Sequence, residues 1–417
     1  MKVLILSSNN GGGHNAVASA LQECFASHGD ECVIRDCLSF VSENLSERIS
    51  RSHNFMYRHL PELFDSGYRR SEENLNLFKE RHGVRNMIDL GRFELGKYIQ
   101  TEGFDMVLCS HVFAAMMLTA AVKQYHLAVR TGIVETDYAN TPGFADNEME
   151  LHFIPDESLA PALLAAGIEE DRIIVSGIPV RREILARTDK EEAKRRMDLP
   201  PEQMHMLLMG GSMGCGPIPE LLQELSEAME ESVQISVVCG SNERLQKSLA
   251  EEYGHMSNIH ILGYVADVSS LYDSADLLIT KPGGITTTEA AVKGLPMVLI
   301  NAVAGCEAHN REFFLKKGGA VTGETVDELC ECCVSLTEGR EALDQMSEAL
   351  HGFASQNAAE TVYAAMKDAG RGKALAHTGR GSEALYPPMC RAACGTRSWK
   401  CRRPSMRRAG SLLTAGA

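Results

Sequence analysis

Short apolar runs alternate with longer amphipathic segments along most of the chain, and each run has the length of a buried strand. Runs that are apolar throughout are typical of parallel strands covered on both faces by helices. We predict six strands in the first half, at residues 1–6, 31–34, 105–109, 129–134, 151–154 and 173–175. Six more follow at residues 206–209, 234–239, 259–262, 277–279, 297–300 and 320–321. The pattern predicts an α/β protein with two Rossmann-like, doubly wound parallel sheets facing each other across a cleft.

The apolar pattern weakens at a charged segment that contains Pro200 and Pro201. We therefore predict a first domain at residues 1–185, a linker at 186–203 and a second domain at 204–368. Residues 371–417 carry ten basic residues against one acid and show no regular period. This basic tail is expected to be disordered; a membrane-binding segment and a non-native terminus both remain open interpretations.

The segment after the strand at 277–279 combines a glycine turn with a helix start. Gly283 and Gly284 permit a tight turn, and the N–H groups that begin the next helix can hold a diphosphate without a lysine or a metal. Glu289, about one turn further on, could accept hydrogen bonds from ribose hydroxyls. Two alternatives remain at this stage, an ordinary turn for the glycines and a capping role for Glu289.

A second glycine-rich turn follows the first strand. Gly11, Gly12 and Gly13 are contiguous and precede His14, so the spacing differs from the dinucleotide-binding fingerprint. A helix N-terminus disfavours a protonated imidazole, which would keep His14 neutral and able to take a proton from a hydroxyl group. A helix-capping role and a phosphate contact are the open alternatives for His14.

The order and spacing of these elements resemble the GT-B glycosyltransferases of family 28, which holds monogalactosyldiacylglycerol synthases, processive diacylglycerol glucosyltransferases and the peptidoglycan-precursor N-acetylglucosaminyltransferase. The resemblance covers roughly residues 1–365. It implies inverting, metal-independent transfer of a hexose from a UDP-sugar to diacylglycerol or a related lipid, with His14 as the base. Asp137 would orient His14 or hold the acceptor hydroxyl, and a turn carboxylate is its alternative.

The resemblance also implies the donor contacts. They are Gly12, Gly13, Gly211, Ser212, Met213, Gly214, Tyr264, Val265, Pro282, Gly283, Gly284, Thr286, Glu289, Cys306, Glu307 and Asn310. A plain turn is the alternative for the glycine loop at 210–214. The final helical segment, about residues 341–367, would pack back across the first domain, as in the family.

Two departures from the family pattern leave the substrates open. Cys306 stands where the family commonly has a glutamine that contacts the sugar, and a thiol is a weak hydrogen-bonding partner. The His-x-x-Trp that usually follows the Thr-Asp element is replaced by residues 140–144. These departures make a non-catalytic nucleotide-sugar sensor an alternative function. A UDP-sugar 2-epimerase is another, because the same fold serves such enzymes, and a transferase to another lipid-linked acceptor also stays open.

Charge and composition limit the partners. The net charge of −15 argues against nucleic acid, whose phosphates need a basic surface. Residues 48–98 interleave basic and aromatic side chains, which is typical of a segment on an anionic membrane surface or of an ordinary pair of surface helices. No long apolar run and no secretory leader are seen, so we expect a cytoplasmic protein, peripheral at the inner face of the membrane.

The remaining composition gives no sign of a cofactor. The thirteen cysteines fall largely within predicted strands and helices and are interpreted as reduced. Cys330, Cys332 and Cys333 have no partner cluster, and no Asp-x-Asp motif marks the donor site. We therefore expect no metal and no cofactor apart from the UDP-sugar donor itself.

Overall fold

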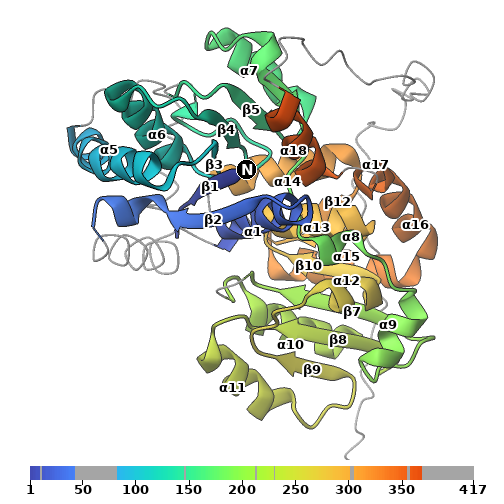
Figure 1. Cartoon of the computed structure of the whole chain (residues 1–417). Coiled ribbons are helices and arrows are strands. Elements are labelled where there is room, and N and C mark those ends of the chain that lie inside the picture. Colours follow the sequence, from blue (N-terminus) through green and yellow to red (C-terminus); the bar gives the residue numbers. More distant parts are fainter. Residues whose placement is uncertain are drawn as a thin grey trace, which may run out of the picture. The chain divides into compact units, whose positions relative to one another are not determined.

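The computed structural model describes residues 1–9, 12–42, 82–144, 147–211, 214–229, 231–300, 305–354 and 357–368 (Figure 1). Within these ranges the predicted strands are all present, and their ends lie within a residue or two of the expected positions. The first six are β1 (Lys2–Ser7), β2 (Glu31–Asp36), β3 (Met106–Cys109), β4 (Arg130–Val134), β5 (Leu151–Ile154) and β6 (Ile173–Val175). The second six are β7 (Met204–Met209), β8 (Val233–Val238), β9 (Ile259–Leu262), β10 (Leu277–Thr280), β11 (Met297–Leu299) and β12 (Ala320–Thr322).

The strands form two six-stranded sheets in which every recorded pairing is parallel. The first sheet has the order β2-β1-β3-β4-β5-β6 and the second the order β12-β11-β10-β7-β8-β9. In each sheet the chain starts at an inner strand, moves to one edge and then returns to the other side of the starting strand. This reversal is the switch point where doubly wound sheets bind ligands at the carboxyl ends of their strands.

Both faces of each sheet are buried, which explains the uninterrupted apolar runs. Val3 and Ile5 of β1 pack into one apolar cluster, whereas Leu4 and Leu6 point to the opposite face and pack into another. All four side chains are fully buried. Because successive side chains of a strand alternate between faces, only a sheet covered on both sides needs such a sequence.

Helices cover the sheets between successive strands (Figure 1). Those of the first half are α1 (Gly12–Ser27), α5 (His82–Glu102), α6 (Val112–Tyr125), α7 (Ala160–Ala165) and α8 (Arg182–Leu185). Those of the second half are α9 (Lys190–Arg196), α10 (Ile218–Ala228), α11 (Glu243–Tyr253), α12 (Ser269–Ser274), α13 (Gly284–Lys293), α14 (Cys306–Lys317) and α15 (Val326–Glu338). No helix in the described part of the chain is long and apolar enough to cross a bilayer.

The final helical segment is divided, which corrects the expectation of one helix at about 341–367. It consists of α16 (Arg340–Ala349), α17 (His351–Ala354) and α18 (Ala358–Asp368). Before α18, the Asn357 side chain accepts a hydrogen bond from the Glu360 N–H, as an N-cap does. The expected packing is present: α18 contacts α1 of the first half, and Phe25 lies edge-on to Tyr363 at a centroid distance of 5.0 Å.

The two sheets are joined by a continuous apolar cluster. Phe25 of α1, Phe314 of α14 and Met366 of α18 belong to the same buried group. The segment after β4 also reaches the second half, where the Tyr138 ring stacks on Phe313 at 4.0 Å and its hydroxyl lies 3.1 Å from the Thr288 hydroxyl. The relative position of the two sheets is therefore fixed by packing as well as by the linker.

Candidate active site

A cavity of about 770 Å³ lies between the carboxyl ends of the two sheets. On the first sheet its walls come from the segments that follow β1, β3 and β4; on the second they come from the segments that follow β7 to β11. This is the position expected for a ligand of two facing doubly wound sheets. The volume falls in the range of small-molecule sites.

His14 lies at this cavity because α1 begins directly after β1. The glycine turn was expected to end at Gly13, but the helix already begins at Gly12, so His14 lies in its first turn. The Nδ1 atom of His14 is 2.7 Å from the carbonyl oxygen of Ser110, which follows β3. Since a carbonyl oxygen can only accept, Nδ1 carries the proton. The neutral ring then has its lone pair on Nε2 and can take up a proton there.

Thr136 and Asp137 form a short chain of hydrogen bonds that ends at Nδ1 of His14. The Thr136 hydroxyl lies 3.2 Å from Nδ1 of His14 and donates to Oδ2 of Asp137, also at 3.2 Å. Burial lowers the pKa of His14, while the charge of Asp137 and the Ser110 carbonyl oppose this shift. Asp137 therefore acts on His14 through Thr136 and through its field, and the imidazole is neutral at pH 7.

A buried carboxyl group lies beside this chain. Glu135 accepts a hydrogen bond of 2.5 Å from the Thr141 hydroxyl and lines the cavity. Burial raises the pKa of Glu135 to about 8, with the neighbouring Asp137 adding to the shift. Glu135 is consequently protonated near neutral pH. The negative charge that acts on His14 is therefore that of Asp137.

The opposite wall is the N-terminus of α13. Gly283 caps this helix with extended backbone angles, and Gly284 is its first residue. A Cβ atom at Gly284 would lie 2.1 Å from the carbonyl oxygen of Thr136, so only glycine allows this close approach. The helix start thus lies against the same segment that supports His14. Its unpaired N–H groups and positive dipole end face the cavity and favour a bound anion.

Glu289 lies one turn further along α13 and is only 5 % exposed. Its carboxyl group accepts a hydrogen bond of 3.1 Å from the Tyr272 hydroxyl and lines the cavity. Burial raises the pKa of Glu289 to about 7, with the positive charge of Arg181 opposing the shift. The second carboxylate oxygen leaves Glu289 with acceptor capacity for a ligand hydroxyl.

Two cations that the sequence analysis did not select also line the cavity. Lys281 follows β10 and binds Oε1 of Glu307 at 2.6 Å, and Arg181 pairs with Glu183 at 2.7 Å. Lys281 thus stands next to the glycine turn, and the expectation that a diphosphate is held there without a lysine stays a prediction. The place of Lys281 directly before Pro282-Gly283-Gly284 was the signal available in the sequence.

The structure brings most of the selected residues together. Those that line the cavity are His14, Asp137, Gly12, Gly13, Gly211, Tyr264, Val265, Gly283, Gly284, Thr286, Glu289, Cys306 and Glu307. Gly214, Pro282 and Asn310 lie outside its walls, and Ser212 and Met213 fall outside the described residues.

Asn310 has a bridging position instead of a place in the cavity wall. Its side chain accepts from the Tyr138 N–H at 2.6 Å and donates to Asp137 at 2.8 Å and to the Pro282 carbonyl at 3.0 Å. These three bonds occupy the buried amide and tie the loop after β4 to the loop after β10. A direct contact of Asn310 with the sugar stays a prediction.

Comparison with known proteins identifies relatives of both halves. Residues 14–180 match the family model described as monogalactosyldiacylglycerol synthase, and residues 205–368 match the glycosyltransferase family 28 C-terminal domain. A processive diacylglycerol beta-glucosyltransferase of Bacillus pumilus is 26% identical over 364 residues, which are 87% of this chain and 93% of the relative.

Solved structures share the fold at lower identity. Acinetobacter baumannii MurG superimposes with a TM-score of 0.59 and 17% identity, covering 88% of this chain and 99% of that one. UDP-GlcNAc 2-epimerase from Neisseria meningitidis, solved with UDP-GlcNAc bound, gives a TM-score of 0.59 and 15% identity, covering 88% of this chain and all (100%) of that one. These neighbours confirm the GT-B fold with its two α/β halves.

Proposed function

This chain belongs to the glycosyltransferase family that joins a monogalactosyldiacylglycerol synthase region to a family 28 C-terminal domain, and we propose that it transfers a hexose, with inversion, from a UDP-sugar to diacylglycerol. The chain is a UDP-glycosyltransferase, and the named relatives use diacylglycerol. The observation that carries the mechanism is the hydrogen bond between His14 Nδ1 and the Ser110 carbonyl, because it leaves Nε2 as the proton acceptor.

The reaction is a single displacement. The acceptor hydroxyl oxygen attacks the anomeric carbon from the face opposite the diphosphate, and its proton passes to Nε2 of His14. The bond between the anomeric carbon and the diphosphate oxygen breaks, and UDP leaves with the electron pair. One such displacement inverts the anomeric centre.

Negative charge builds up on the leaving diphosphate, and the chain has groups to stabilise it. The N-terminus of α13, which begins at Gly284, supplies N–H donors, and Lys281 and Arg181 line the same cavity. Preorganised donors and cations of this kind stabilise developing charge in a water-poor site. We therefore propose transfer without a metal ion, and a chelator is expected to leave the rate unchanged.

We place the reaction at the inner membrane surface, where a diacylglycerol acceptor resides. α5 presents Leu90 and Phe93, which are 64% and 43% exposed, and the Arg92 guanidinium lies over the Phe93 ring at 4.8 Å. An exposed pair of apolar side chains beside a cation suits the headgroup region of an anionic bilayer. Residues 48–81 of the basic and aromatic segment at 48–98 lie outside the described residues.

The test is incubation of the purified protein with radiolabelled UDP-glucose or UDP-galactose and diacylglycerol-containing vesicles, followed by lipid extraction. Label in the organic phase supports the proposal and identifies the sugar. Turnover of UDP-N-acetylglucosamine without any acceptor would support a 2-epimerase, and UDP binding without turnover would support a sensor. Either result would overturn lipid glycosylation.

The role of His14 has its own variant. His14→Ala is expected to lower the transfer rate by about two to four orders of magnitude, the usual effect of losing a general base, with UDP affinity nearly unchanged. His255→Ala, a change at an exposed histidine, serves as the control. Unchanged turnover in His14→Ala would remove His14 from the mechanism.

A further inference from the structure

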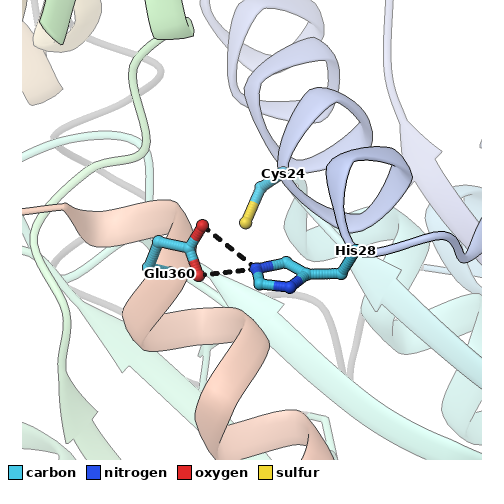
Figure 2. A group of neighbouring side chains, drawn as sticks. All are labelled: Cys24, His28 and Glu360. Carbon is cyan, nitrogen blue, oxygen red and sulfur yellow. Dashed lines mark hydrogen bonds and ion pairs between the residues drawn. The ribbon is translucent and has the colours of Figure 1, made fainter.

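Three metal-ligating side chains meet away from the cavity, on the outer end of α1 (Figure 2). Cys24 lies in the last turn of α1, His28 directly follows this helix, and Glu360 lies in the first turn of α18. Cys24 is ten residues from His14, about 15 Å along the helix, so this cluster does not belong to the active site. Cys24 and Glu360 are separated by most of the sequence, which is why no motif indicated them.

The distances suit a single small ion. Nε2 of His28 lies 3.1 and 2.9 Å from the two carboxylate oxygens of Glu360, and one ligand atom from each of the three residues lies within 4.8 Å of the others. Tetrahedral zinc, with bonds of 2.0–2.3 Å, needs ligand atoms roughly 3.3–3.8 Å apart. Small side-chain rotations would bring the three atoms to these separations. Figure 2 shows the three side chains pointing toward one another.

The surrounding residues hold the ligands in place. The His28 ring stacks on Tyr363 at a centroid distance of 3.9 Å and an interplanar angle of 9°, and Tyr363 in turn contacts Phe25. One turn further along α18, Lys367 pairs with Asp30 at 3.3 Å. The imidazole plane is thereby fixed with Nε2 directed at Glu360, which is the preorganisation that a metal site requires.

The charges also balance. A divalent cation would be held by one thiolate and one carboxylate, whose charges it neutralises, with a neutral imidazole as third ligand. A cation here would also lie at the negative end of the α1 dipole.

We propose that Cys24, His28 and Glu360 bind a zinc ion that ties α18 to α1. The mixed sulfur, nitrogen and oxygen ligands are those that zinc accepts, and the half-exposed positions of His28 and Glu360 leave room for water as the fourth ligand. The ion is structural, because it clamps the end of the described chain onto the helix that carries His14. The sequence analysis expected no metal, so this site is an addition to it.

The test compares thermal unfolding of the metal-stripped full-length protein with and without added zinc. Zinc is expected to raise the Tm of the wild type by at least about 3 °C, and to leave the Tm of Cys24→Ser and Glu360→Gln unchanged. Cys332→Ser is the matched control, since Cys332 is a half-buried cysteine on α15, and it should respond like the wild type.

Two outcomes would overturn the site. If Cys24→Ser and Glu360→Gln respond to zinc like the wild type, the ion binds elsewhere, for example at Cys390, Cys394 or Cys401. If no protein responds, the cluster is a hydrogen-bonded group only. The assay contains no UDP-sugar and no lipid, so its result is independent of the proposed transferase activity.

Discussion

Replacing Gly284 with alanine tests the close contact between the start of α13 and Thr136 of the other half. The added Cβ atom would lie 2.1 Å from the Thr136 carbonyl oxygen and 2.9 Å from Oδ1 of Asp137. A carbon and a carbonyl oxygen normally approach no closer than about 3.3 Å, so the backbone must move by roughly 1.2 Å. Both partners are anchored: Asp137 accepts from Asn310, and Tyr138, the next residue, donates its N–H to Asn310.

Overpacking of a well-packed site costs typically about 1–3 kcal/mol, and a clash with backbone belongs at the upper end. We therefore expect Gly284→Ala to lower the free energy of unfolding by about 3 kcal/mol. Moving α13 away from Thr136 also separates the diphosphate-binding helix start from His14. The transfer rate should then fall by more than about tenfold even where the protein is fully folded.

Gly283→Ala is the matched control, because the same atom is added one residue earlier in the same turn. There the nearest atom to a new Cβ is Cε of the flexible Lys281 side chain, at 4.0 Å. The expected loss is no more than about 1 kcal/mol, the preference of an N-cap for glycine over alanine. Urea unfolding followed by circular dichroism measures both values. Equal stabilities of the two variants would refute the close approach of Gly284 to Thr136.

Two further predictions concern buried carboxyl groups. Glu289→Ala should weaken UDP binding, measured by calorimetry, by about 1.5–3 kcal/mol, the range of a hydrogen bond to a charged group. The control Tyr272→Phe keeps the carboxyl group and should change the affinity by less than about 1 kcal/mol. An unaltered affinity in Glu289→Ala would move the ribose site elsewhere. The pKa of Glu135 is raised to about 8 in the folded protein, so the unfolded wild type releases this proton at a lower pH than the folded wild type does. The wild type therefore loses stability as the pH rises from 5 to 8, and Glu135→Gln does not. In urea unfolding the variant should gain on the order of a few kcal/mol relative to the wild type over this pH range. Glu148→Gln, at an exposed carboxyl group, is its control, and the same pH slope in the wild type and Glu135→Gln would contradict the raised pKa.

The strands were predictable because parallel strands buried on both faces need continuous apolar runs. The same argument located the cavity, since the carboxyl ends of such strands face the ligand. His14 and the turn at Gly283 and Gly284 followed from their places after β1 and β10.

What the sequence did not disclose depends on contacts between distant segments. Asn310 was selected as a donor contact, but its bonds to Tyr138 and Pro282, which join two loops, could not be inferred from its place in a helix. Arg181 is a single cation whose neighbours in sequence do not mark a cavity, whereas the glycine turn beside Lys281 was a signal for that residue. The break before α18 had a local signal in Asn357, a residue that favours N-cap positions, but the apolar period masked it.

The hydrogen bonds around Asn310 have a consequence for the timing of catalysis. The loop that orients the proton acceptor and the loop that begins the donor helix share one amide, so they can be in place only together. If the halves part to admit a substrate, Asp137 loses its hydrogen bond to Asn310, whereas the Ser110 carbonyl, in the same half as His14, still holds the imidazole. The full set of contacts around the base is therefore complete only when the two halves are closed.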